Sequence, residues 1–131
     1  MSPEPSLGRI HQIALHVTDL DRSIAWYRDV LGLPFLFQAP NVAFFDCAGT
    51  RLMVSPLGSG AFRPSSSVLY FGVADIHDAA RILGERGLAF GQEPHLVARL
   101  PDHEVWLAEF ADPDGNPLAL MSERPVPRPE P

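Results

Sequence analysis

The stretch HQIALHVTDLDRSIAWYRDVLGL, residues 11–33, predicts a β-strand followed by a helix. In its first part large apolar residues occupy every second position, the period of a strand with two different faces. Asp19 then offers a carboxylate that can accept from the free backbone N–H groups at a helix start. Beyond it, apolar residues recur at steps of four, three and four, which places them on one helix face. These residues are Leu20, Ile24, Tyr27 and Leu31. Gly32 suits the left-handed position after a helix, so we expect the helix to end there.

The same pattern returns farther along the chain, so the sequence contains an internal repeat. Adding 56 to a residue number in the first copy gives its counterpart in the second copy. The matched positions are Ile13 with Leu69, Leu15 with Phe71, Val17 with Val73, Asp19 with Asp75, and Ile24 with Ala80. The closing strands match as well, because residues 49–54 align with residues 115–120. The repeat predicts two copies of one strand–helix–strands unit.

Shorter strands are expected to complete each copy. In the first copy they are residues 35–38, 42–46 and 51–55. In the second copy a strand at residues 68–73 precedes a helix that starts at Asp75, and further strands follow at residues 88–92, 105–110 and 118–121. The sequence DPDGN, residues 112–116, predicts a tight turn before the last strand, because Pro113 fixes φ and Gly115 permits a positive φ.

The length of 131 residues indicates one domain. We expect an N-terminal tail at residues 1–8, the domain at residues 9–123 and a Pro-rich C-terminal tail at residues 124–131. Within the domain, the two modules lie at about residues 9–56 and 67–123, joined by a segment rich in Gly, Ser and Pro.

The composition restricts the partners of this domain. The formal net charge of −6 repels phosphate backbones and argues against nucleic-acid binding. No apolar run approaches the ~20 residues needed to span a bilayer, and residues 1–8 lack the features of a signal peptide. Cys47 is the only cysteine, which excludes an intramolecular disulfide and fits a reducing compartment. The sequence therefore predicts a cytoplasmic protein without membrane or nucleic-acid partners.

Residues 11–33, together with FADPDGNPLALMSE at residues 110–123, resemble the opening and closing motifs of the vicinal oxygen chelate superfamily. That superfamily includes glyoxalase I, methylmalonyl-CoA epimerase, extradiol dioxygenases, and the bleomycin- and fosfomycin-resistance proteins. The resemblance covers roughly residues 9 to 123. It implies an α+β fold of two tandem βαβββ modules whose mixed sheets curl around a central cavity. It also implies a homodimer, as in many relatives, and a small-molecule ligand.

Metal-dependent members of this superfamily place one ligand on the first and last strand of each module. At the matching positions this sequence has Gln12, Met53, Val68 and Ala119. Only the amide oxygen of Gln12 suits a hard metal ion, since a thioether prefers soft ions and Val and Ala carry no donor. The sequence therefore departs from the pattern at three of these positions, and we expect no metal and no cofactor. A shift of the alignment by one residue would bring in His11 instead.

Two further side chains share strand faces with these positions. His16 shares a face with Gln12 and is expected to point into the same cavity. Its imidazole suits a general acid or base, and it equally suits a hydrogen-bonded structural histidine. Tyr70 shares a face with Val68 and either contacts a ligand or forms a buried, hydrogen-bonded core residue.

Trp106 and Arg51 complete the candidate set. The indole of Trp106 suits stacking on a flat ligand as well as packing in the core, and Arg51 suits an anionic substrate group as well as solvent. The predicted ligand-binding residues are thus Gln12, His16, Arg51, Met53, Val68, Tyr70, Trp106 and Ala119.

Three functions remain open on these residues. The first is a metal-independent binding protein similar to the bleomycin-resistance branch, with a mainly apolar cavity and a few polar anchors. The second is a glyoxalase-type lyase, isomerase or dioxygenase with a non-standard metal site. The third is a non-catalytic scaffold or sensor domain whose cavity is filled by side chains.

Overall fold

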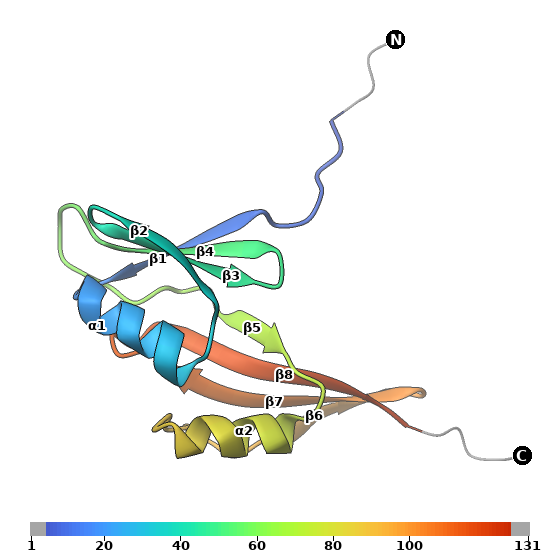
Figure 1. The fold of residues 1–131 in the computed structure, drawn as a ribbon. Coiled ribbons are helices and arrows are strands. Elements are labelled where there is room, and N and C mark those ends of the chain that lie inside the picture. The colour runs from blue at the N-terminus through green and yellow to red at the C-terminus, as the bar shows by residue number, and fades with distance from the viewer. Residues whose placement is uncertain (1–4, 127–131) are drawn as a thin grey trace, which may run out of the picture.

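The computed structural model describes residues 5–126 and contains two mixed four-stranded sheets (Figure 1). The first module consists of β1 (Gln12–Val17), α1 (Leu20–Ala25), the π-helical turn η1 (Trp26–Val30), β2 (Phe35–Ala39), β3 (Val42–Cys47) and β4 (Thr50–Pro56). The second module consists of β5 (Leu69–Gly72), α2 (Ile76–Glu85), β6 (His95–Arg99), β7 (His103–Ala111) and β8 (Pro117–Pro125). No helix among the described residues is long and apolar enough to cross a membrane.

The two modules have the same topology, so the internal repeat and the α+β class are confirmed. The strand orders are β1-β4-β3-β2 and β5-β8-β7-β6, with β1 parallel to β4 and β5 parallel to β8. Ala14 pairs with Met53 in the first sheet, and its repeat counterpart Tyr70 pairs with Ala119 in the second. The two sheets stay separate in the described part of the chain and do not close into one barrel.

The helix boundaries follow the local signals in the sequence. The carboxylates of Asp19 and Asp75 cap α1 and α2 by accepting from backbone N–H groups three residues later, each at 3.1 Å. Gly32 ends the first helical segment at a φ of 82°, a left-handed conformation that favours glycine. The π-helical turn η1, which lies between α1 and Gly32, places Tyr27 in the core. The adjacent Trp26 packs against that core.

The prediction of a strand at residues 88–92 is wrong. Leu88 is buried and Phe90 forms only an isolated bridge to Phe110, so the apolar signal reflects packing of a loop against the core. The strand that pairs with β7 is β6, which begins after Pro94.

The last strand is longer than the expected 118–121. β8 continues through Arg124 and Pro125, two residues assigned to the C-terminal tail by the sequence. Proline is tolerated there because β5 pairs with β8 only as far as Met121, so in the described part of the chain that edge of β8 has no partner strand at Pro125. Of the two predicted tails, residues 1–4 and 127–131 lie outside the described residues.

One face of each sheet packs on a core that the two modules share. Leu15, Tyr27 and Phe45 from the first module and Phe110 and Leu120 from the second belong to the same buried cluster. We call these the helix-side faces, because α1 and α2 pack on them. The remaining faces point away from the shared core, and we call them the open faces. The open face of the first sheet carries Gln12, Ala14, His16, Phe44, Arg51 and Met53, and that of the second sheet carries Tyr70, Gly72, Leu107, Glu109, Ala119 and Met121.

The predicted turn at residues 112–116 joins the two modules. The buried Asp112 carboxylate accepts from the Tyr27 hydroxyl at 2.7 Å, and it also accepts from the Asn116 side chain at 2.8 Å. The Asn116 amide in turn donates to the backbone oxygen of His16 at 2.9 Å. Asp114 extends the contact, because its carboxylate accepts from Arg22 at 2.7 Å and from Thr18. We call this set the Asp112 latch.

We expect Tyr27→Phe to lower the free energy of unfolding by about 1–2 kcal/mol, because Asp112 loses one donor while keeping the others. Urea denaturation at neutral pH measures the change. Tyr70→Phe is the matched control, because Tyr70 is exposed and should leave the stability unchanged.

The same variant has a second signature at high pH. Burial, reinforced by Asp112, raises the pKa of Tyr27 above its ordinary value of 10.0. The unfolded chain therefore loses this proton first, and stability should fall as the pH rises above about 10. In Tyr27→Phe this decrease in the free energy of unfolding should be smaller. An equal decrease with pH in the wild type and in Tyr27→Phe would contradict the role of the buried hydroxyl.

Candidate functional site

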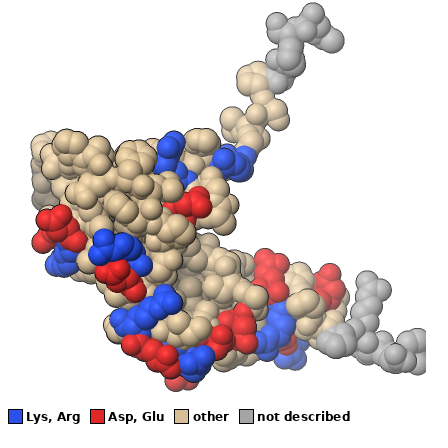
Figure 2. Space-filling view, viewed as in Figure 1, with Lys and Arg blue, Asp and Glu red and all other residues tan. Residues whose placement is uncertain are grey.

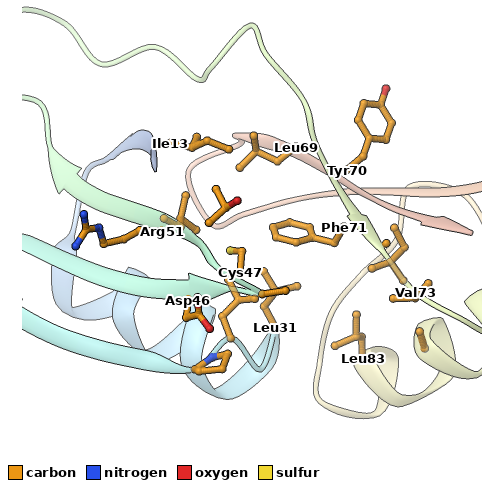
Figure 3. A pocket seen from close by; sticks show the side chains of 18 of the residues that line it. Ile13, Leu31, Asp46, Cys47, Arg51, Leu69, Tyr70, Phe71, Val73 and Leu83 are labelled. Carbon is orange, nitrogen blue, oxygen red and sulfur yellow. The ribbon is translucent and has the colours of Figure 1, made fainter. Parts of the chain in front are cut away.

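A cleft of about 980 Å³ lies between the two modules, at the end of the shared core (Figure 3). The first module contributes apolar side chains such as Ile13 and Leu31. The second module contributes Leu69, Phe71 and Leu83, so β5 and α2 form the opposite wall. Figure 3 shows Phe71 directed across the cleft toward the first module. The cleft therefore opens into the apolar interior. Its shape depends on how the two modules are placed relative to each other.

Charged side chains are unevenly spread over the visible face. Figure 2 shows acidic and Arg side chains over α1, α2 and the outer end of the second sheet, whereas much of the first module and most of the hollow between the modules are uncharged. Such a surface favours an apolar or weakly polar ligand.

The polar groups at the cleft are engaged locally. The Asp46 carboxylate accepts from the Gly49 backbone N–H at 2.9 Å, and the Thr50 hydroxyl donates to the Ile10 backbone oxygen at 2.9 Å. Cys47 is half-buried, and desolvation, together with the neighbouring Asp46, raises its thiol pKa to about 11. The thiol is therefore neutral at ordinary pH and contributes a weakly polar wall to the cleft.

Three of the predicted ligand-binding residues border the cleft, namely Arg51, Val68 and Tyr70. The head group of Arg51 turns to the open face, where it donates to the Gln12 side-chain oxygen at 2.8 Å and lies 5.7 Å from the Phe44 ring centre. The Tyr70 side chain is 53% exposed and points away from Phe71 (Figure 3).

The other five predicted residues do not line the cleft. Gln12, His16 and Met53 lie on the open face of the first sheet, while Ala119 is the strand partner of Tyr70 in the second sheet and is fully buried. Trp106 lies on β7 of the second module and packs against the shared core.

Trp106 packs between β7 and α2, against the shared core. Its ring meets His77 of α2 edge to face at 5.1 Å, and Arg124 lies 5.7 Å from the indole centre. Its indole N–H donates to Glu104 at 3.3 Å. These contacts correspond to the packing alternative for this residue, and the eight predicted side chains do not meet at one place in the chain.

The positions that hold a metal in some relatives do not fit one here. Val68 and Ala119 carry no donor atom, and the Gln12 oxygen already accepts from Arg51. Within residues 5–126 no three His, Cys, Asp or Glu side chains cluster closely enough to hold an ion. The donor set therefore does not match the hard or borderline metals of such sites.

The sequence missed most of the residues that line the cleft. Leu31 belongs to the apolar face that the sequence predicts for the first helix, and Phe71 is the repeat counterpart of the strand residue Leu15. The spacing of such apolar residues is the same whether neighbouring side chains cover them or whether they border a cleft. Only the relative placement of the modules distinguishes the two, and no local signal encodes that placement.

A model of the Glyoxalase/Bleomycin resistance protein/Dioxygenase superfamily matches residues 9–120. The uncharacterized protein YraH of Bacillus subtilis (strain 168) is 30% identical over 129 residues, which span 86% of this chain and 96% of that protein. Mitochondrial methylmalonyl-CoA epimerase of Mus musculus is 35% identical over 65 residues, spanning 44% of this chain and 36% of the epimerase. The crystal structure of a glyoxalase/bleomycin resistance protein/dioxygenase from Nocardioides has the same fold, with a TM-score of 0.71 at 21% identity, covering 97% of this chain and 91% of that one.

We expect the Cys47 thiol to react with iodoacetamide at pH 8 about a hundredfold more slowly than an unperturbed cysteine, because little of it is ionised. Mass spectrometry over time measures the rate. The same chain unfolded in guanidinium is the control, since it holds one cysteine. Equal rates in the folded and unfolded chains would show that Cys47 is not shielded.

Proposed function

This chain belongs to the Glyoxalase/Bleomycin resistance protein/Dioxygenase superfamily, and we propose that it binds a small, mainly apolar molecule in the cleft between its modules. The observation that carries the proposal is the cleft itself, whose volume of about 980 Å³ is that of a small-molecule site. Both modules contribute to its walls, so one ligand contacts both halves of the chain.

The chemistry of the walls defines the ligand class. Phe71, Leu83 and Leu31 offer apolar contact, and burying apolar surface stabilises a complex by about 25 cal/mol per Å². The nearby Asp46 and Thr50 side chains are satisfied within the first module. A ligand therefore gains affinity from shape and apolar area, and its polar groups stay at the mouth beside Tyr70.

We propose that this binding needs no resident metal. The proposal rests on the donors at the positions where metal-dependent relatives hold an ion, since two of these four residues, Val68 and Ala119, carry no ligand atom. We also propose that the protein acts as a homodimer in the cytoplasm, which agrees with its single free cysteine.

We expect Ala79→Phe to weaken binding of the neutral dye Nile red by at least about tenfold, because Ala79 lines the cleft and a larger side chain fills it. Fluorescence titration of the full chain measures the affinity. Ala25→Phe is the matched control, since Ala25 is an exposed helical alanine outside the cleft. Equal loss in both variants, or no dye binding by the wild type, would refute the cleft as the binding site.

Elemental analysis of the purified protein should find well below one transition-metal ion per chain, and chelation should leave dye binding unchanged. A stoichiometric metal that Gln12→Ala removes would instead support a non-standard metal site at the open face of the first sheet. Gln38→Ala is the control, because Gln38 lies on the exposed strand β2 away from β1.

A further inference from the structure

An arginine of the second module lies on the backbone of the first module beside the cleft. Arg86 is the residue that follows α2, and its guanidinium lies directly on Gly32. A Cβ atom at position 32 would lie 2.7 Å from Arg86 Nη1 and 3.8 Å from its Cζ. The contact in its present form is therefore possible only because residue 32 has no side chain.

This contact lies at the end of the cleft opposite the mouth. Gly32 stands between Leu31 and Leu33, which line the cleft from the first module, and Arg86 comes one helical turn after Leu83, which lines it from α2. Figure 3 shows Leu31 and Leu83 near one end of the cleft and Tyr70 at the other. We call the end beside Leu31 and Leu83 the far end. The Arg86 side chain joins the two walls of the cleft there.

Electrostatics favours this position of the Arg86 side chain. The backbone carbonyls at the end of a helix carry a partial negative charge, so a cation placed there is stabilised. Gly32 directly follows the helical segment formed by α1 and η1, and the guanidinium on it therefore lies at such an end. Within residues 5–126 Arg86 forms no salt bridge that would draw it elsewhere.

A guanidinium is also a suitable end wall for an apolar cleft. Arg86 is exposed, so its charge stays hydrated on the outer side. Placing a hydrocarbon group against the charge would remove part of that water, which is unfavourable. An apolar ligand that fills the cleft therefore gains nothing by extending past Arg86.

We propose that Arg86 limits the length of the ligand that the cleft accepts. This inference rests on the proposed function, since it concerns a ligand in the same cleft. A hydrocarbon chain enters beside Tyr70, passes between Phe71 and Leu31, and stops at Arg86. The ligand class is an amphiphile whose polar end stays at the mouth and whose linear alkyl or acyl chain has a limited length.

A series of linear primary alcohols from hexanol to dodecanol measures this limit. Displacement of Nile red from the full chain gives the affinity of each alcohol. In the wild type each added methylene should improve the affinity about fourfold until the chain reaches Arg86, and longer chains should gain nothing further. In Arg86→Ala the gain should continue, so the first alcohol beyond the wild-type limit should bind at least about tenfold more tightly than to the wild type.

Arg81→Ala is the control on the same helix. The Arg81 guanidinium pairs with Asp78 and Glu85 of α2, so this variant should keep the wild-type limit. If Arg86 were only structural, Arg86→Ala would weaken all the alcohols alike and leave the limit where it is. That result would overturn the proposal, and so would a wild-type series without a limit.

Gly32→Ala displaces Arg86 without removing it. The new methyl group would overlap the guanidinium, which must move aside because it is the end of a flexible side chain. The limit should therefore shift toward longer alcohols, as in Arg86→Ala, and the double variant should show no further shift. Gly87→Ala controls for backbone strain, since Gly87 has a φ of 100° and no described atom lies within 4 Å of an added Cβ. Equal shifts in Gly32→Ala and Gly87→Ala would contradict the role of Arg86.

The outcome is distinguishable from failure of the proposed function. If Nile red does not bind the wild type, the cleft is not a ligand site and both proposals fail. If the alcohols displace the dye but Arg86→Ala has the wild-type limit, the cleft binds ligands and only the role of Arg86 is wrong.

Discussion

The carboxylate of Asp112 determines how the two modules are placed. It accepts from the buried hydroxyl of Tyr27 in the first module while holding Asn116 in its own turn, and Asn116 bonds to the end of β1. A buried carboxylate without these donors would be costly, so the native arrangement is favoured over other placements of the modules. The shared core, the cleft at its end and the outward direction of the open faces all follow from this placement.

Much of the fold was accessible from the sequence, because its determinants are local. The caps at Asp19 and Asp75, the glycine after the first helix and the turn at residues 112–116 act within a few residues of themselves. The internal repeat strengthened these predictions, because the same order of strand, helix cap and turn occurs in both modules. The failure at residues 88–92 came from a loop whose apolar residues, Leu88 and Phe90, are held by packing and not by strand pairing.

The site was less accessible, because it depends on distances between modules. Strand alternation placed Gln12 and His16 on one face and Tyr70 on its repeat counterpart, and the structure agrees on those faces. The sequence pattern did not indicate whether these two sheet faces are directed toward each other or away from each other. The cleft residues Phe71 and Leu83 have the sequence spacing of ordinary core residues. Their spacing therefore does not indicate that they border an opening in the core.

The length mismatch between β5 and β8 has a consequence for aggregation. Within residues 5–126 the outer edge of β8 has no neighbouring strand beyond Met121, and such edges recruit strands from other molecules. Here that segment carries Glu123, Arg124 and Pro125, two charges and a residue without a backbone N–H. These are the residues that natural proteins place on exposed edges to prevent fibre-like growth. This sheet edge is thereby protected against open-ended strand addition.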